Sequence, residues 1–300
     1  MTILVSGASG FLGKKLIDKL AISNEKIIAT YNSNTDSSTL EAANVSWINV
    51  DLSNQNLDLS FLPKIDKVIN LAGLTLGSSN NDLSYFYSNE LITFNLLNKL
   101  STTCQDFIHA SSQVVYGNAN NLNVSEKFPR DVKESSYACS KVNSENWLKW
   151  FQRKNNGRYI SLRLCGFIDG GGLIDYIIDR ALQNNEIELF SNGKISRDYL
   201  PAEDAISAIL NSMKYIDTLS ENFYPINIGS GQPISSMDIA KLIKETLKSG
   251  SKITTSSKKG PQDNFVFDIT TAKELIKFLP SDLHTEISKY ALLRKADYEK

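Results

Sequence analysis

The chain has 300 residues, and its 41% hydrophobic and 22% charged residues indicate a folded globular protein of two lobes or one large α/β unit. Lys and Arg number 32 against 33 Asp and Glu, so a net charge of -1 gives no general basic excess for nucleic acid or an anionic membrane. No segment approaches the ~20 apolar residues of a membrane span, and no signal peptide precedes the first strand. We therefore expect a cytoplasmic protein.

The cysteines and histidines do not predict a metal site. The chain has three cysteines without a CxxC pair, and two histidines. Zinc sites need four closely grouped ligands of these types, so we expect no metal. Unpaired thiols agree with a reducing compartment.

The first half of the chain alternates short apolar runs with segments of helical periodicity. Such alternation predicts right-handed crossovers and a parallel sheet covered by helices on both faces, that is, a doubly wound Rossmann α/β fold. The predicted strands are 2–5, 26–31, 45–50, 67–72, 107–110 and 159–164, and the predicted helices are 11–20, 83–101 and 137–153.

The pattern changes after Cys165, where three consecutive glycines at 170–172 predict a break. Helices are predicted over 173–183, 205–215, 236–248 and 283–294, and a surface loop over 249–262, which is rich in Ser, Lys and Gly. We predict a dinucleotide-binding domain over 1–165 and a smaller C-terminal α/β substrate lobe over 166–300 that is partly interleaved with the first.

A glycine-rich turn directly follows the first strand and opens the first helix. Glycines there allow a tight turn and a close approach of the backbone to a pyrophosphate, and the helix N-terminus offers free N–H groups to it. The context of strand, turn and helix favours a dinucleotide site over an ordinary βα turn. The predicted cofactor contacts of the turn are Gly7, Ser9, Gly10, Phe11, Leu12 and Gly13.

The end of the second strand selects between NAD and NADP. A carboxylate there binds the free ribose 2′-hydroxyl and repels a 2′-phosphate, and here none occurs before Asp36. The small polar side chains that stand there instead can bind a 2′-phosphate, so the sequence favours NADP, with NAD as the alternative. The same residues also suit a polar turn without any role in cofactor binding. Asp51 is predicted to accept from the adenine amine. The predicted contacts of these two strand ends are Tyr31, Asn32, Ser33, Asp51 and Leu52.

Tyr137 and Lys141 stand four residues apart in a predicted helix and therefore share one face. A phenol with a pKa of ~10 is a poor base at neutral pH, and a nearby ammonium is expected to lower that pKa. Ser112 follows the fifth strand, at the edge of the sheet where ligands bind, and is predicted to hydrogen-bond the reacting oxygen. The three residues together predict proton transfer coupled to hydride transfer.

These motifs, in this order, resemble the extended short-chain dehydrogenase/reductase family, in its nucleotide-sugar epimerase/dehydratase group. The resemblance covers nearly the whole chain. It implies that Tyr137 exchanges the proton of a sugar hydroxyl, that Lys141 holds the nicotinamide ribose, and that Ser112 orients the substrate oxygen. It further implies cofactor contacts at Leu71, Ala72, Gly73, Tyr137, Lys141 and Cys165, and substrate contacts at Ser112, Gln113, Tyr137 and Arg197.

Three departures from the family pattern narrow the activity. Gln113 and Val114 replace the Asp-Glu pair of the dehydratases, which disfavours a 4,6-dehydratase. Gly166 replaces an Asn that helps many epimerases bind the diphosphate, which weakens the expectation of a nucleotide diphosphate. A late arginine near the substrate phosphates has no clear match, and Lys258 or Lys259 is the expected substitute.

Three functions agree with the sequence. The first is an NADPH-dependent ketoreductase of a keto-deoxysugar carried on a nucleotide, and the second a nucleotide-sugar 4-epimerase that uses NAD. The third, a non-catalytic dinucleotide-sensing protein, is disfavoured because all three catalytic positions are filled. A homodimer through the two predicted helices that follow the fourth and fifth strands is a hypothesis, with Leu91, Phe94, Leu97 and Trp147 as candidate contacts.

Overall fold

The structure is a computed structural model, and it describes residues 1–32, 41–117, 119–132, 135–260 and 263–300. It divides into two compact units, each built from three separate segments. Unit 1 consists of Met1–Gly117, Pro129–Arg163 and Ile206–Ile226, and unit 2 of Asn118–Phe128, Leu164–Ala205 and Asn227–Lys300. The boundary at residue 165 stays a prediction. In the described part of the chain, no helix combines the length and the apolar character that crossing a membrane requires.

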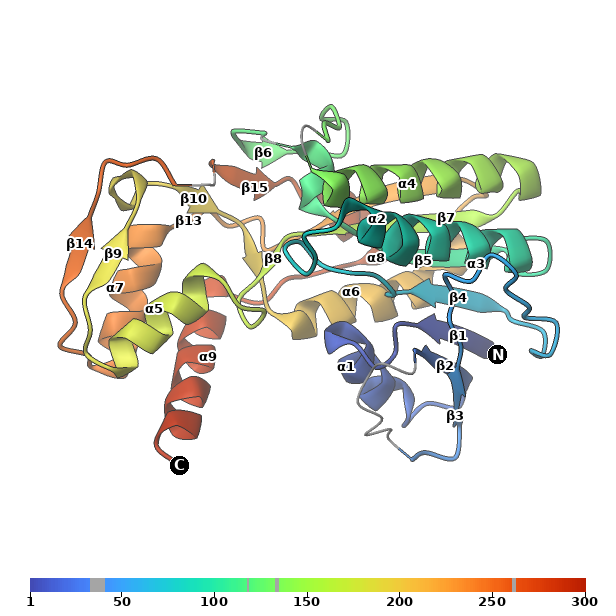
Figure 1. The fold of residues 1–300 in the computed structure, drawn as a ribbon, viewed down its shortest axis with the longest axis horizontal. Coiled ribbons are helices and arrows are strands. Elements are labelled where there is room, and N and C mark those ends of the chain that lie inside the picture. The colour runs from blue at the N-terminus through green and yellow to red at the C-terminus, as the bar shows by residue number, and fades with distance from the viewer. Residues whose placement is uncertain (33–40, 118, 133–134, 261–262) are drawn as a thin grey trace. The chain divides into compact units, whose positions relative to one another are not determined.

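A seven-stranded sheet in the order β12-β7-β5-β4-β1-β2-β3 forms the centre of unit 1 (Figure 1). The pairs β1/β2, β1/β4, β2/β3 and β4/β5 are all parallel. The strand order reverses at β1, as in a doubly wound sheet, so the predicted Rossmann fold is confirmed. The strands are β1 (Thr2–Ser6), β2 (Lys26–Tyr31), β3 (Val45–Asn49), β4 (Lys67–Asn70), β5 (Asp106–Ser112), β7 (Arg158–Leu164) and β12 (Phe223–Ile228).

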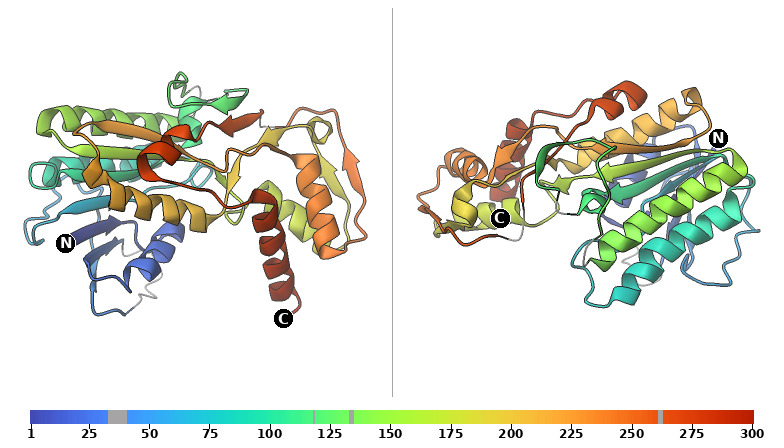
Figure 2. Two further views of the ribbon diagram at one scale, coloured as in Figure 1. Left: turned by 180° about the vertical axis from the view of Figure 1, so that it is seen from behind. Right: turned by 90° about the horizontal axis from the view of Figure 1, so that it is seen from above.

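Helices cover both faces of this sheet. On one face, α3 (Ile92–Leu100) and α4 (Ser136–Asn155) lie side by side, and α1 (Phe11–Leu20) and α6 (Ala202–Tyr215) lie on the other (Figure 2). Leu96, Leu148 and Phe107 are buried in the core between the sheet and α3 and α4. Leu97, which we predicted as a dimer contact, is also fully buried in this core and is therefore not available to a second subunit.

The predicted helix over 83–101 is interrupted. It consists of α2 (Asp82–Tyr85), the π-helical turn η1 (Phe86–Leu91) and α3. A π turn holds one more residue per hydrogen-bonded ring than an α-helix, so it rotates the side chains that follow, and such turns are frequent at functional sites. Apolar spacing alone does not distinguish it from a regular helix.

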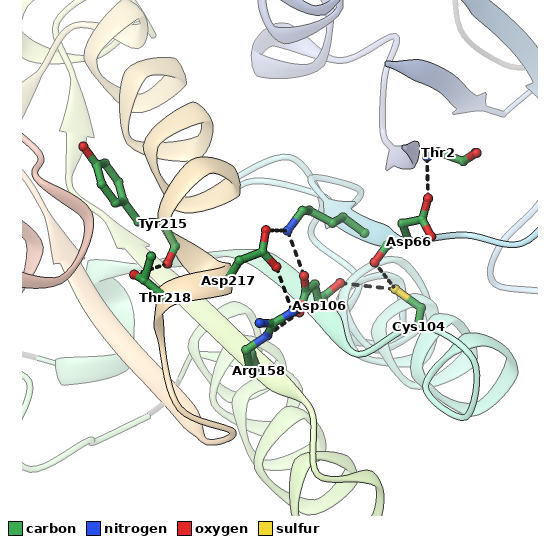
Figure 3. A network of polar contacts seen from close by, with 9 residues as sticks. Thr2, Asp66, Cys104, Asp106, Arg158, Tyr215, Asp217 and Thr218 are labelled. Carbon is green, nitrogen blue, oxygen red and sulfur yellow. Dashed lines mark hydrogen bonds and ion pairs between the residues drawn. The ribbon is translucent and has the colours of Figure 1, made fainter. Parts of the chain in front are cut away.

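An ionic network, buried at Lys67 and Asp106 and exposed at Asp217, joins the starts of three strands in unit 1 (Figure 3). The Nζ atom of Lys67 lies 2.8 Å from Oδ2 of Asp106 and 2.9 Å from Oδ2 of Asp217. Arg158 donates to the second oxygen of each carboxylate at 2.8 Å. The Lys67 side chain is only 3% exposed, so the carboxylates of Asp106 and Asp217 replace the water that would otherwise stabilise its ammonium group.

Unit 2 has its own core, in which α5 (Leu173–Leu182), α7 (Ser236–Leu247) and α9 (Leu283–Tyr298) pack with β9 (Ile187–Leu189). The predicted loop over 249–262 is partly wrong, because β14 (Ile253–Thr255) pairs with β9. Short strands are hard to recognise in polar sequence because their pairing, not their composition, defines them. The other elements are η2 (Gln113–Tyr116), β6 (Asn121–Val124), β8 (Gly166–Phe167), η3 (Ser191–Gly193), β10 (Ser196–Arg197), β11 (Tyr199–Leu200), η4 (Ile216–Thr218), β13 (Ile234–Ser235), β15 (Phe265–Phe267) and α8 (Thr270–Ile276).

Candidate active site

The glycine-rich turn has the geometry of a phosphate cradle. Gly7 has a φ of +69°, and a Cβ atom there would lie 2.7 Å from the backbone nitrogen of Ala72. A Cβ atom on Gly13 would collide with the carbonyl oxygen of Gly7. Only glycine therefore lets the start of α1 approach both β1 and the chain after β4 this closely. The predicted contacts Leu71, Ala72 and Gly73 lie directly beside this turn, since Leu71 donates to the Ser6 carbonyl at 3.1 Å.

The strand ends that we predicted to contact the adenosine part of a dinucleotide are only partly described. Tyr31 ends β2 and packs edge-on against Trp47, with ring centroids 6.1 Å apart. Asn32 follows it, and Ser33 lies outside the described residues. Asp51 already accepts from both the backbone and the hydroxyl of Ser53, so its carboxylate closes a local turn. Leu52 is buried in the core, which leaves only its backbone for a ligand.

The predicted catalytic residues come together at the ends of β5 and α4. Ser112 is the last residue of β5, and its hydroxyl hydrogen-bonds Tyr137. The Nζ atom of Lys141 lies 5.9 Å from the centroid of the Tyr137 ring and donates to the Ala110 carbonyl at 2.9 Å. Ser135 caps α4 by accepting from the Ala138 backbone at 3.2 Å, which fixes the start of the helix next to Tyr137. The carboxyl end of β5 and the first turns of α4 thus form one polar centre.

Burial governs the protonation of this centre. Burial raises the pKa of Tyr137 above its usual value, against the hydrogen bond of Ser112, which lowers it. Burial also lowers the pKa of Lys141 to about 8, partly offset by the charge of Glu145. We predicted that Lys141 lowers the pKa of Tyr137, but here the loss of hydration outweighs any such effect. Tyr137 is therefore a phenol at neutral pH, ready to donate a proton.

Asn89 contacts two segments of the predicted site and was not among the predicted site residues. It lies in the π turn η1, where its Oδ1 accepts from the backbone N–H of Leu74 at 2.7 Å. Its Nδ2 donates to the Leu74 carbonyl at 3.2 Å and to the Ser140 hydroxyl at 3.0 Å. A Cβ atom on Gly73 would approach Asn89 Oδ1 to 2.5 Å. Asn89 therefore ties the predicted cofactor segment after β4 to the catalytic helix α4.

Glu145 anchors the same helix to the sheet. Its fully buried carboxylate accepts from Arg163 Nε at 2.9 Å and from a terminal nitrogen of Arg163 at 2.6 Å. It also accepts from Ser111 at 2.8 Å, one residue before Ser112. Burial alone would raise the pKa of Glu145, but the hydrogen bonds and charge of Arg163 lower it below its usual value. Glu145 stands four residues after Lys141, so helical spacing already placed it on the catalytic face.

The remaining predicted residues have separate surroundings. Gln113 begins η2, and its buried Oε1 has no hydrogen-bond partner among the described residues, which leaves it free for a ligand. Cys165 and Arg197 belong to unit 2, and burial raises the pKa of the Cys165 thiol well above its usual value. Arg197 donates to the Asp263 carbonyl at 2.9 Å and stacks on Phe265.

A cavity of about 310 Å³ in unit 1 and one of about 470 Å³ in unit 2 were not predicted. The cavity in unit 2 has Arg197 in its wall, together with apolar side chains such as Leu189 and Phe190. Asp198, next to Arg197, instead has a structural role, since it accepts from the backbone N–H groups of Ser230 and Phe267 at 2.8 and 3.2 Å.

Comparisons with known proteins agree with this geometry. The model of the NAD dependent epimerase/dehydratase family matches residues 3–229. A putative UDP-glucose 4-epimerase of Methanocaldococcus jannaschii is 26% identical over 91% of this chain and 92% of its own. A dTDP-4-dehydro-6-deoxyglucose reductase of Escherichia coli is 27% identical over 81% of this chain and 79% of its own. UDP-glucuronic acid decarboxylase 4 of Arabidopsis thaliana is 22% identical over 93% of this chain but 65% of its own.

Solved structures share the fold. The UDP-glucose 4-epimerase of Thermotoga maritima, solved with UDP-glucose, superposes with a TM-score of 0.84 at 23% identity, covering 99% of both chains. The UDP-glucuronic acid 4-epimerase of Bacillus cereus, solved with NAD, gives 0.81 at 21% identity, covering 98% of this chain and 99% of its own. The family model matches most of the length of the chain, and the glycine turn and the predicted catalytic residues agree with it: the chain is an enzyme that belongs to the NAD-dependent epimerase/dehydratase family.

Proposed function

We propose that the protein reduces the keto group of a deoxysugar carried on a nucleotide, with NADPH as the preferred cofactor. The arrangement of Ser112, Tyr137 and Lys141 carries this proposal. When bound, the dinucleotide supplies a hydride, and the glycine turn at Gly7 and Gly13 fits its pyrophosphate. The absence of a carboxylate at Tyr31 and Asn32 supports NADPH over NADH.

The protonation of the centre supports reduction. A carbonyl that receives a hydride needs one proton on its oxygen, and Tyr137, whose pKa is raised, holds that proton at neutral pH. Ser112 donates a hydrogen bond that polarises the carbonyl. The Lys141 ammonium then stabilises the phenolate that Tyr137 leaves behind. An epimerase completes its reaction with the same reductive step, so the protonation of Tyr137 fits both candidates.

The cavity of unit 2 supports a nucleotide as the carrier. Its Arg197 offers a positive charge for a diphosphate, and Phe190, 44% exposed, offers an apolar surface for a base. Its volume of about 470 Å³ falls within the usual range for small-molecule sites.

The second candidate is a nucleotide-sugar 4-epimerase that retains NAD. The relative from Methanocaldococcus jannaschii favours it. That protein is named a putative UDP-glucose 4-epimerase, and it is similar to this chain over 92% of its own length. Gly166, which replaces the diphosphate-binding Asn of many epimerases, counts against a nucleotide diphosphate in both candidates and does not decide between them.

The test is to extract and identify the cofactor of the purified protein, then to assay it with NADPH and a nucleotide-linked 4-keto-6-deoxysugar. We expect little retained cofactor, consumption of NADPH, and a Tyr137→Phe variant that binds NADPH normally but turns over ~10²–10⁴ times more slowly. Tightly retained NAD with conversion of UDP-glucose and no added cofactor would establish the epimerase instead. Full activity of Tyr137→Phe would refute both.

The homodimer remains a proposal. Phe94 and Trp147 pack edge-on at 4.8 Å between α3 and α4, and Trp150 on α4 is 50% exposed. Light scattering tests it, and a monomeric mass would reject it.

A further inference from the structure

Unit 1 contains a cavity that none of the predicted catalytic or cofactor residues lines. Its volume is about 310 Å³, and it lies between the second half of α4 and the start of β12. Phe223 and Pro225 of β12 give it an apolar wall. Its basic lining residues are Arg130, Lys149, Arg153 and Arg163.

The charges of this cavity are strongly unbalanced. Four basic side chains line it, and Glu145 is the only acidic one. The carboxylate of Glu145 is already neutralised by the two hydrogen bonds from Arg163. Lys149 and Arg153, one helical turn apart on α4, form no ion pair with any described residue. The cavity therefore carries a local excess of positive charge in a protein whose net charge is -1.

Arg130 is placed to serve a ligand. Its guanidinium contacts Glu145 Oε2 at 3.3 Å, a weak contact beside the 2.6 Å bond that Arg163 makes to the same oxygen. Its other terminal nitrogen donates to Asn146 at 2.9 Å. Arg130 can thus turn toward an anion without leaving Glu145 unpaired, and its side chain is 33% exposed. A planar guanidinium binds phosphate oxygens in pairs.

We propose that this cavity binds a compact phosphate-bearing anion, held by Arg130, Lys149 and Arg153, at a site separate from those for dinucleotide and substrate. The amides of Asn146 and Asn222 supply further donors at its rim. The volume of about 310 Å³ is at the small end of the range for ligand sites, so it admits a compact anion but not a second dinucleotide.

The experiment is calorimetric titration of the 300-residue protein with pyrophosphate at low salt. Saturating NADPH occupies the dinucleotide site, and saturating UDP occupies the unit 2 cavity that we assign to a nucleoside diphosphate. We expect binding to one site per chain that weakens as salt is raised. In the double variant Lys149→Ala/Arg153→Ala, binding should weaken roughly tenfold or more, because two charge-assisted contacts are lost.

Two control variants make the result specific. Lys154→Ala removes a neighbouring charge of α4 that lies over the Trp150 ring and does not line the cavity, and it should leave binding unchanged. Arg197→Ala removes the arginine of the unit 2 cavity and should also leave binding unchanged. No binding by the unaltered protein, equal binding by the double variant, or loss of binding in Arg197→Ala would each overturn the proposal. None of these outcomes depends on which sugar the enzyme reduces.

Discussion

Tyr137 and Lys141 share a buried helix face, and burial shifts their proton equilibria in opposite directions. The Tyr137 phenol is kept protonated, whereas the Lys141 ammonium becomes easier to deprotonate, with a pKa of about 8. Burial always favours the neutral form, which is the acid for a phenol and the base for an amine. The pair is thus prepared for proton donation at neutral pH and loses its positive charge at moderately alkaline pH.

We predict that kcat/KM for ketone reduction falls as the pH rises through about 8. Lys141 is charged below its pKa of about 8 and neutral above it, and only the charged form stabilises the tyrosinate formed by proton donation. The measurement is a pH profile of kcat/KM for the wild type and for Lys141→Arg. The arginine stays charged throughout, so the decline near pH 8 should disappear even if the rate is lower. The same decline in the variant would contradict the assignment to Lys141.

Local spacing explains why some of the site could be predicted and some could not. The geometry of the glycine turn and the proximity of Tyr137 and Lys141 depend only on nearby positions in the sequence, so both could be predicted. The environment that raises the pKa of Tyr137 comes from tertiary burial and could not. The pairing of Glu145 with Arg163 likewise joins α4 to β7, and helical spacing indicates only the face on which Glu145 lies.

At the scale of elements, the π turn η1 determines what Asn89 contacts. A regular α-helix through the same residues would turn the Asn89 side chain by a different angle, because one residue fewer completes each ring. Apolar periodicity predicts the extent of this helical segment but not its extra residue. The role of Asn89 was missed for that reason.

We predict that Asn89→Leu lowers the free energy of unfolding by about 1–3 kcal/mol. The variant removes the partner of the half-buried backbone N–H and carbonyl of Leu74 and of the buried Ser140 hydroxyl, and polar groups shielded from water are costly when unpaired. Urea denaturation provides the measurement. Asn98→Leu, at an exposed position of α3, is the matched control. If the control loses as much stability, the effect belongs to the helix and not to the Asn89 contacts.

At the scale of the whole molecule, the ionic network of Lys67, Asp106, Arg158 and Asp217 connects the starts of β4, β5 and β7 with η4 (Figure 3). These residues come from distant parts of the chain. The alternation of strands and helices predicted the parallel sheet. No local pattern, however, indicates which charged side chains meet at the N-terminal ends of its strands.

We predict that Lys67→Met lowers the free energy of unfolding by about 3 kcal/mol. Removal of one partner of a buried ion pair leaves the other charge without full compensation, and Asp106 is also buried. Lys64→Met, at an exposed position nearby, controls for the change of residue type and should alter stability by less than about 0.5 kcal/mol. Equal midpoints in urea for the two variants would show that the network adds nothing.

The interleaving of the two units has a consequence for synthesis on the ribosome. The three segments of each unit alternate along the chain, so the chain passes between units five times. Since β7 and β12 complete the sheet beyond β5, the nascent chain must hold β5 as an open strand edge until residues 158–164 emerge. We expect a fragment ending at residue 157 to aggregate through that edge when expressed, whereas the complete chain stays in the supernatant. Neither unit can be produced as one contiguous fragment, because segments of the other unit interrupt it. Both units must therefore fold within the same chain.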